Sequence, residues 1–267
     1  MPELEIHGAR IHYEDTGPGS TGETVALSHG LLWSTELFRP QIERLRGRYR
    51  VVAWDHRGQG RSSDDPRDVI GMELLTDDAL ALFDALGLER VHFVGLSMGG
   101  FVGMRLAGRH AARLHSLALL DTRAEPEPRA HVPRYRALAL AARVLGVGVV
   151  AGRVMPILFG RTVLEDPARA ADRAAFRAAL SGNRRTIWRA LNGVVYREGV
   201  EHLLPKIRVP TLVLTGEQDV ATPPDCGRRI HEGIAGSRFV LVPRAGHSSC
   251  VEAPDAVSEA LERHLAG

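Results

Sequence analysis

The chain of 267 residues has almost no lysine, since Lys206 is the only lysine among 34 lysine and arginine residues. Lys206 lies in the link that precedes an apolar, strand-like run, and not beside any candidate site. Schiff-base catalysis and P-loop phosphate binding both depend on a lysine at the reacting group. The composition therefore argues against both chemistries.

Cysteine is also scarce. Cys226 and Cys250 are the only two cysteines, and their separation is not a metal-ligand spacing. The sequence leaves a disulfide between them open but does not require one. Cys250 lies close to His247 in the sequence, and we interpret it as an ordinary buried thiol. We expect neither a metal nor a cofactor.

A strong net charge and long apolar runs are absent as well. The formal net charge is +2, without the clustered basic footprint that nucleic-acid binding needs. The N-terminus lacks the basic start and apolar stretch of a signal peptide, and the longest apolar run, near residues 144–151, is far too short to span a bilayer. We expect a soluble, cytoplasmic protein with no nucleic-acid or membrane partner. The sequence carries no signal for the oligomeric state.

The sequence does contain a regular alternation of strand and helix patterns. Residues 4–7 and 10–14 predict an opening hairpin around Gly8, and the runs at 24–28 and 50–54 predict strands. Helical patterns near residues 37–45 and 72–86 alternate with these strands, and residues 254–265 predict a closing helix. Such alternation predicts an α/β fold with a mainly parallel sheet.

The alternation stops after Asp121, where the sequence becomes rich in alanine and arginine with helical spacing. The strand pattern resumes only after Pro205 and Pro210. We therefore expect residues 1–122 and 199–267 to form an α/β core, and residues 123–198 to form an inserted helical cap, or lid.

A glycine-flanked serine marks the candidate nucleophile. Gly95-Leu96-Ser97-Met98-Gly99 follows the apolar run 91–94 and precedes a helical pattern. A strand, a serine between glycines and a helix, in that order, form a nucleophile elbow, in which the serine takes a strained conformation and its hydroxyl is exposed. The Met98 N–H then lies at a helix N-terminus, where it can stabilise an oxyanion.

A serine nucleophile needs a base, and the base needs an orienting acid. Asp219 lies in the loop beyond the strand-like run 211–215, and His247 lies in the loop beyond the run 238–242. Catalytic groups of α/β sheets lie beyond the carboxyl ends of strands. Asp121 also follows an apolar run, so it is the alternative acid, although we favour Asp219.

The motifs together make the chain resemble the α/β-hydrolases, in the branch of esterases, 3-oxoadipate enol-lactonases and cofactor-free haloperoxidases. Besides the elbow, the matching segments are Ser28-His29-Gly30-Leu31-Leu32-Trp33, Asp55-His56-Arg57-Gly58-Gln59-Gly60-Arg61-Ser62, Gly216-Glu217-Gln218-Asp219 and Ala245-Gly246-His247. The resemblance covers nearly the whole chain. It implies an eight-stranded, mainly parallel sheet flanked by helices, with an inserted helical lid.

Carried over residue by residue, the resemblance implies Ser97 as nucleophile, His247 as base and Asp219 as its acidic partner. It also implies that the backbone N–H groups of Leu31 and Met98 form the oxyanion hole. We expect His29 to order this loop by hydrogen bonding, without a chemical role. The glycines at 58 and 60 indicate a tight structural loop, because no phosphate-binding lysine follows them.

The substrate is predicted less sharply. Leu32 and Trp33 beside the oxyanion hole predict an apolar pocket, and Met155, Leu158, Phe159 and Trp188 belong either to its wall or to the core of the lid. We expect a serine esterase for small to medium apolar carboxylic esters. The alternatives are an enol-lactone or C–C bond hydrolase, a haloperoxidase or perhydrolase, and a ligand sensor without turnover. Haloalkane dehalogenases and epoxide hydrolases need an aspartate where this chain has Ser97.

Overall fold

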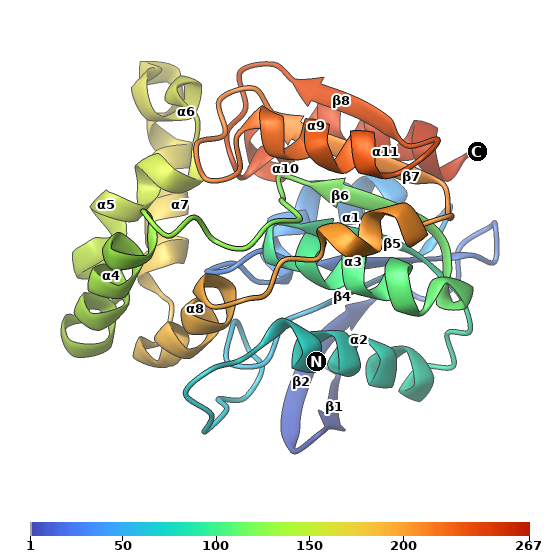
Figure 1. The fold of residues 1–267 in the computed structure, drawn as a ribbon, viewed down its shortest axis with the longest axis horizontal. Helices are drawn as coiled ribbons and strands as arrows, with labels where there is room; N and C mark the ends of the chain where they lie inside the picture. Colours follow the sequence, from blue (N-terminus) through green and yellow to red (C-terminus); the bar gives the residue numbers. More distant parts are fainter. Residues whose placement is uncertain (1) are drawn as a thin grey trace.

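The computed structural model describes residues 2–267, and its centre is an eight-stranded sheet (Figure 1). The strands follow one another across the sheet in the order β1-β2-β4-β3-β5-β6-β7-β8. Strands β3 to β8 pair in parallel, and β1 and β2 add an antiparallel edge. Their bounds are β1 (Glu3–Ile6), β2 (Ala9–Asp15), β3 (Thr24–Ser28), β4 (Arg50–Trp54), β5 (Val91–Leu96), β6 (Leu114–Leu120), β7 (Thr211–Gly216) and β8 (Arg238–Val242).

The local sequence explains both the edge and the centre of this sheet. The hairpin β1–β2 turns at His7 and Gly8, whose positive φ angles of 48° and 74° are those of a tight hairpin turn. Every residue of β3 and β5 is buried, as expected for parallel strands that are covered by helices on both faces. The predicted strands at 24–28 and 50–54 and the predicted parallel sheet are confirmed.

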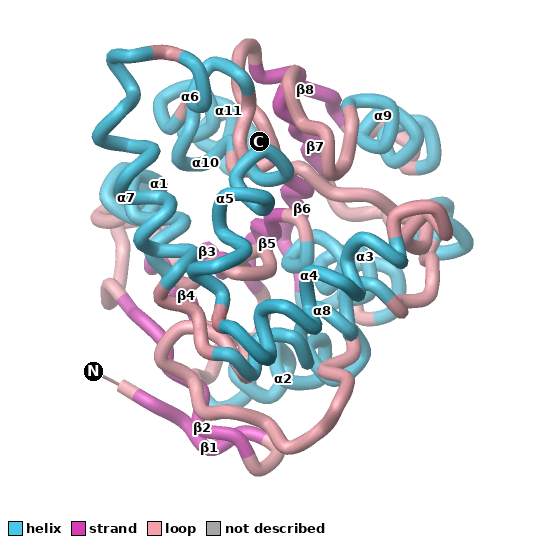
Figure 2. The backbone as a smooth tube through the Cα atoms, turned by 90° about the vertical axis from the view of Figure 1, so that its left-hand side faces the viewer, coloured by secondary structure: helices cyan, strands magenta, loops and turns pink. Residues whose placement is uncertain are grey.

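Helices cover the two faces of the sheet. Figure 2 shows α1 and α11 on one side of the strands and α2, α3 and α9 on the other. The bounds of the helices that flank the sheet are α1 (Arg39–Leu45), α2 (Met72–Ala85), α3 (Met98–Arg109), α9 (Pro224–Gly233), α10 (Ser249–Glu252) and α11 (Pro254–Leu265).

Five helices lie between β6 and β7, and the described chain contains no strand between Leu120 and Thr211. Figure 1 shows them gathered beyond one end of the strands. They are α4 (Val132–Leu145), α5 (Val147–Leu158), α6 (Arg161–Glu165), α7 (Ala170–Ser181) and α8 (Trp188–Val195). We call this part the α4–α8 segment. The division into a core and a cap at residues 123 and 198 stays a prediction.

No helix within residues 2–267 is both long enough and apolar enough to cross a bilayer.

Candidate active site

The turn between β5 and α3 presents Ser97. Its backbone has φ 53° and ψ −108°, a conformation that side chains rarely adopt. Glycines are required on both sides of it, since a Cβ on Gly95 would lie 2.3 Å from the Gly99 carbonyl oxygen, and a Cβ on Gly99 would lie 2.0 Å from the Ser28 carbonyl oxygen. The G-x-S-x-G pattern therefore reflects how closely the strand, the turn and the helix pack.

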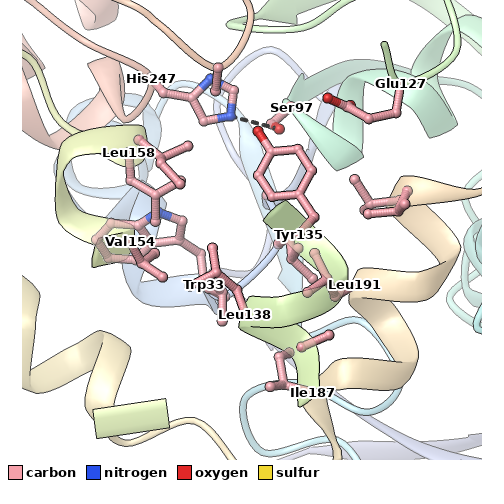
Figure 3. Close-up of a pocket in the computed structure, with 18 of the residues that line it drawn as sticks. Trp33, Ser97, Glu127, Tyr135, Leu138, Val154, Leu158, Ile187, Leu191 and His247 are labelled. Atoms are coloured by element: carbon pink, nitrogen blue, oxygen red, sulfur yellow. Dashed lines mark hydrogen bonds between the residues drawn. The ribbon is translucent and has the colours of Figure 1, made fainter. Parts of the chain in front are cut away.

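Three side chains from three loops form a hydrogen-bonded chain. The Ser97 Oγ lies 2.8 Å from His247 Nε2, and His247 Nδ1 lies 2.8 Å from Asp219 Oδ2. The imidazole of His247 and the carboxylate of Asp219 are both buried. In Figure 3, His247 and Ser97 face each other at one end of a cavity. The structure thus brings together the three residues that the sequence predicts as nucleophile, base and acid.

The loop after β7 holds the Asp219 carboxylate in place. Its Oδ1 accepts hydrogen bonds from the N–H groups of Ala221 and Thr222 at 2.8 and 2.9 Å. The Thr222 hydroxyl donates to Oδ2 at 2.7 Å and lies 3.2 Å from His247 Nδ1. This role of Thr222 is not among the predictions made from the sequence. An aspartate in a loop often accepts hydrogen bonds from the backbone N–H groups that follow it, and this tendency could have indicated the turn from Asp219 to Thr222.

The alternative acid, Asp121, lies next to the same loops but contacts different groups. Its Oδ1 accepts from the Gly216 N–H at 2.8 Å, and its Oδ2 accepts from the Ser249 N–H at 3.2 Å. Burial, reinforced by the negative charge of Asp219, raises the pKa of Asp121 to about 8. The geometry therefore favours Asp219 as the partner of His247, while Asp121 joins the end of β7 to the start of α10.

Electrostatics at His247 favour its protonated form. Burial by itself lowers the pKa of His247, but the charge and hydrogen bond of Asp219, helped by Asp121 and Glu252, outweigh burial and raise it above the usual value. An imidazole with a raised pKa is a stronger base towards a serine hydroxyl. Burial, followed by the charge of Asp121, raises the pKa of Cys250 well above its usual value, which agrees with an inert thiol.

The loop after β3 lies against the elbow. A Cβ on Gly30 would lie 3.4 Å from the Ser97 Cβ, so the next backbone amide, that of Leu31, is close to the nucleophile. The Met98 N–H begins α3 and has no acceptor within the helix. Leu31 thus adjoins a residue that packs on Ser97, Met98 directly follows Ser97, and their role as oxyanion donors stays a prediction.

Hydrogen bonds fix this loop. The Leu32 N–H donates to Gln59 Oε1 at 2.9 Å, and His29 Nδ1 lies 2.7 Å from the Gly30 carbonyl oxygen. On its other side, His29 Nε2 accepts from the His56 N–H at 3.0 Å. His29 thus orders the loop, as the sequence predicts. The turn at residues 58–60 contributes the side-chain oxygen of Gln59, which accepts the hydrogen bond from Leu32.

The cavity in front of Ser97 is mostly apolar. Leu31, Leu32 and Trp33 line it from the sheet side, and the α4–α8 segment supplies most of the remaining wall, including Leu138, Val154, Leu158, Ile187 and Leu191 (Figure 3). Its volume of about 120 Å³ compares with engineered apolar cavities of about 150 Å³ that take up benzene. The cavity therefore suits a small or medium apolar group.

The predicted pocket residues divide between the wall and the interior. Leu158 and Trp188 line the cavity, whereas Phe159 is buried and stacks on Phe176 with ring centroids 4.7 Å apart. The side chain of Met98 is fully buried, and its Sδ lies 3.7 Å from Gln59 Nε2. Met98 thus faces the substrate site through its N–H group and not through its side chain.

A polar group of residues interrupts the apolar wall, and the sequence analysis missed it. Glu127 accepts a hydrogen bond from Arg197 at 3.2 Å, and the Arg197 guanidinium lies over the Phe101 ring at 4.0 Å. Figure 3 shows the Glu127 carboxylate and the Tyr135 hydroxyl at the end of the cavity near Ser97. Burial lowers the pKa of Arg197 to about 10 and raises the pKa of Tyr135. No local pattern marks these residues, because the fold brings them together.

Two hydrogen-bonded links tie the start of α6 to the catalytic loops. Glu252 Oε2 accepts from the Gly160 N–H at 2.8 Å, while its Oε1 accepts from the Ser248 N–H at 3.1 Å. Gln218 Oε1 accepts from the Thr162 N–H at 3.0 Å. The start of α6, in the middle of the α4–α8 segment along the chain, is thereby fixed to the residues next to Asp219 and His247.

No group of three or more histidine, cysteine, aspartate or glutamate side chains within residues 2–267 could hold a metal ion. Cys226 and Cys250 are both buried and unpaired.

Comparison with known proteins gives the same fold and family. RutD of Caulobacter sp. (strain K31), whose name makes it a candidate carbamate hydrolase, is 32% identical over 98% of this chain and 95% of its own. The enol-lactonase of Burkholderia xenovorans LB400 has 31% identity and a TM-score of 0.90 over the full length of both chains. A thermophilic esterase from Thermogutta terrifontis has 31% identity and a TM-score of 0.91 over 99% of this chain and 98% of its own.

The sheet order, the serine elbow and the matching relatives all point to one family. The family model described as the alpha/beta hydrolase fold matches residues 23–254. The chain therefore belongs to the α/β-hydrolase family.

Proposed function

We propose that this chain is a serine hydrolase that cleaves carboxylic esters of small to medium apolar substrates. The observation that carries the proposal is the hydrogen-bonded series Ser97–His247–Asp219, which opens on an apolar cavity. A serine, a histidine and an aspartate in this geometry are suited to acyl transfer. Hydrolysis as the reaction class is also supported by the similarity of the chain to an esterase and to an enol-lactonase.

In the first step, His247 Nε2 takes the proton of Ser97 while the Oγ attacks the carbonyl carbon of the ester. The negative charge that develops on the carbonyl oxygen is stabilised by the N–H groups of Leu31 and Met98. Asp219 holds the proton on Nδ1 and stabilises the imidazolium. The C–O bond then breaks, and His247 donates its proton to the departing alcohol.

In the second step, water attacks the acyl-enzyme. His247 takes a proton from the water as its oxygen bonds to the acyl carbon, and the same two amides again stabilise the oxyanion. The Ser97–acyl bond breaks, and the proton returns from His247 to Ser97. The products are one carboxylic acid and one alcohol, with no cofactor consumed.

Enol-lactone hydrolysis is the second candidate, because the enol-lactonase of Burkholderia xenovorans LB400 matches the chain over its full length. A lactone is an internal ester, so the steps above apply to it unchanged. Hydrolysis of a carbamate ester, the reaction suggested by the name of RutD, differs in the nitrogen on the acyl carbon: Ser97 would be carbamoylated, and the carbamic acid released by water would decompose to an amine and CO₂. The cytoplasmic location stays a prediction.

The proposal is tested by turnover on a matched panel. We expect continuous hydrolysis of aryl esters with increasing acyl length, with a preference for short to medium chains; lactones and aryl carbamates in the same assay decide between the alternatives. A ligand sensor would give at most a stoichiometric burst of product.

A fluorophosphonate probe tests the nucleophile independently of the substrate. Peptide mapping should find the label on Ser97, because a phosphonylated serine resembles the tetrahedral intermediate. Ser249→Ala is the matched control, since this buried serine begins α10 two residues after His247 and contacts Asp121 through its backbone N–H. Labelling should survive in Ser249→Ala and disappear in Ser97→Ala. A label on any other residue contradicts the mechanism.

A further inference from the structure

The charge of this chain is unevenly distributed. Residues 123–198 contain fourteen arginines and six acidic residues, a formal charge of +8. The whole chain carries only +2, so the remaining residues carry −6. The α4–α8 segment is thus strongly cationic, whereas the sheet and its flanking helices are acidic. This asymmetry gives the molecule one positive end.

Within that end, the α4–α5 hairpin has no acidic residue at all. Between Glu127 and Glu165 every charged residue is an arginine. Arg134, Arg136 and Arg153 are exposed on the two helices. Within residues 2–267, these three arginines form no hydrogen bond or ion pair. Their charges are therefore available to a partner.

The same hairpin exposes large apolar side chains. Leu140 and Val149 are 62% and 65% exposed, and Val144 and Leu145 are each 57% exposed. These four account for more than half of the exposed large hydrophobic residues in the described chain. Exposed apolar groups that gather in one place, unlike scattered ones, indicate a contact surface.

Helix α5 shows this most clearly. Val150, Val154 and Leu158 on its inner side line the active-site cavity, while Val149 and Pro156 are exposed. Arg153 is its only charged residue. A helix that is apolar on all sides is normally buried, yet Figure 2 shows α4 and α5 on the viewer's face of the molecule. The inner face is explained by the cavity, and the outer face has no partner among the described residues.

We propose that the outer face of the α4–α5 hairpin docks on an anionic lipid surface. Leu140, Val144, Leu145 and Val149 would enter the boundary between headgroups and acyl chains, and the surrounding arginines would contact the anionic headgroups. The acidic remainder of the chain orients the molecule, since only this end is attracted.

A second copy of the chain fits the face less well. A symmetric contact would bring the unpaired arginines of the two hairpins together, and like charges repel. Docking revises the expectation that the chain has no membrane partner. That expectation rested on the absence of a membrane span and on the net charge of the whole chain. The net charge conceals the opposite charges of residues 123–198 and of the remaining residues.

The test measures binding of the purified full-length chain to vesicles. Vesicles of phosphatidylcholine alone are compared with vesicles of phosphatidylcholine and phosphatidylglycerol, each at low and high salt. We expect binding only to the phosphatidylglycerol vesicles, and loss of that binding at high salt. This comparison needs no variant, and its readout does not involve ester hydrolysis, so it is independent of the proposed function.

Two double variants test the surface itself. Arg136→Gln with Arg153→Gln should weaken binding about thirtyfold, at roughly fivefold for each cation removed. Leu140→Gln with Val149→Gln should weaken it at least tenfold, on the order of what burial of two apolar side chains contributes. Arg263→Gln on α11 and Val69→Gln in the loop before α2 are the matched controls, and both should bind as the unaltered chain does. Circular dichroism and the thermal midpoint verify that each variant is folded.

Several results would overturn the proposal. These are an absence of salt-sensitive binding to phosphatidylglycerol vesicles, or binding that both double variants retain. A dimer that dissociates in Leu140→Gln with Val149→Gln would assign the face to a second copy. Binding of polyglutamate together with no binding to vesicles would assign it to an acidic protein partner.

Discussion

Replacement of Asp219 by asparagine tests the acid of the site with almost no change of shape. In the unaltered chain, Asp219 Oδ2 accepts a hydrogen bond from the protonated Nδ1 of His247 at 2.8 Å. An asparagine can present its NH₂ group to the same nitrogen, which then becomes the acceptor, and the ring proton moves to Nε2. The Nε2–H would face Ser97 Oγ and could not remove its proton.

A histidine held in the wrong tautomer typically lowers turnover by about 10⁴, which corresponds to about 5.4 kcal/mol in the activation barrier. Asp121→Asn is the matched control, since this carboxylate is buried beside the same loops but bonds to the Gly216 and Ser249 amides. Burial and the charge of Asp219 raise the pKa of Asp121 to about 8, and the Asp121 carboxylate forms no hydrogen bond with His247. Its loss should change turnover only a few-fold, while a weakened amide contact costs about 1 kcal/mol of stability.

The assay is kcat/KM for an aryl ester across the pH range. Activity should rise as pH increases through the pKa of His247, because the base must be neutral. Asp219 holds this pKa above the usual value, so Asp219→Asn should move the rise to lower pH as well as reducing the plateau. If Asp121→Asn is the more damaging change, Asp121 is the acid and the assignment made from geometry is wrong.

Three further predictions concern the nucleophile, the oxyanion hole and the elbow. Ser97→Ala and His247→Ala should each lower ester turnover by about 10⁴ to 10⁶, and the double variant should be little worse because the two act as a unit; substantial turnover in either folded variant rejects the assignment. Leu31→Pro, which removes one N–H, should slow ester hydrolysis and fluorophosphonate labelling by about 10² to 10³, whereas Leu31→Ala should keep most of the rate; equal rates would show that this amide does not act. Gly99→Ala should destabilise the fold by about 3 kcal/mol in urea unfolding, because its Cβ would lie 2.0 Å from a backbone oxygen. Gly71→Ala, with no atom within 4 Å of the added Cβ, is the control, and equal losses would contradict the packing argument.

Local pattern was enough to predict the parts of this molecule that depend on neighbours in sequence. The strand at 24–28, the closing helix at 254–265 and the elbow around Ser97 each carry their own periodicity or turn chemistry, and each lies where expected. Chain order and the rule that catalytic groups follow strand ends also predicted that Asp219 and His247 lie close to Ser97.

The polar group of Glu127, Tyr135 and Arg197 could not be predicted in the same way. Its members come from the loop before α4, from α4 and from the loop after α8, and only the packing of the helices brings them together. The link from Glu252 to Gly160 joins residues 92 positions apart and leaves no local trace. Whether Asp121 or Asp219 contacts the histidine is likewise a question of side-chain direction, which periodicity does not encode.

The hydrogen bonds that fix the start of α6 have a consequence for where substrates can enter the cavity. Lifting the start of α6 would pull on Glu252, in the short helix α10 just after His247, and on Gln218, which precedes Asp219. A gate at that point would therefore disturb the catalytic groups each time it opened. Helix α4 packs mainly on α5 and α8, within the segment itself. We therefore expect substrates to be admitted by movement of α4 and not of α6, so that the catalytic groups stay assembled. Mutations in the part of α4 that lies away from Ser97 should then change which molecules enter more than what is done to them.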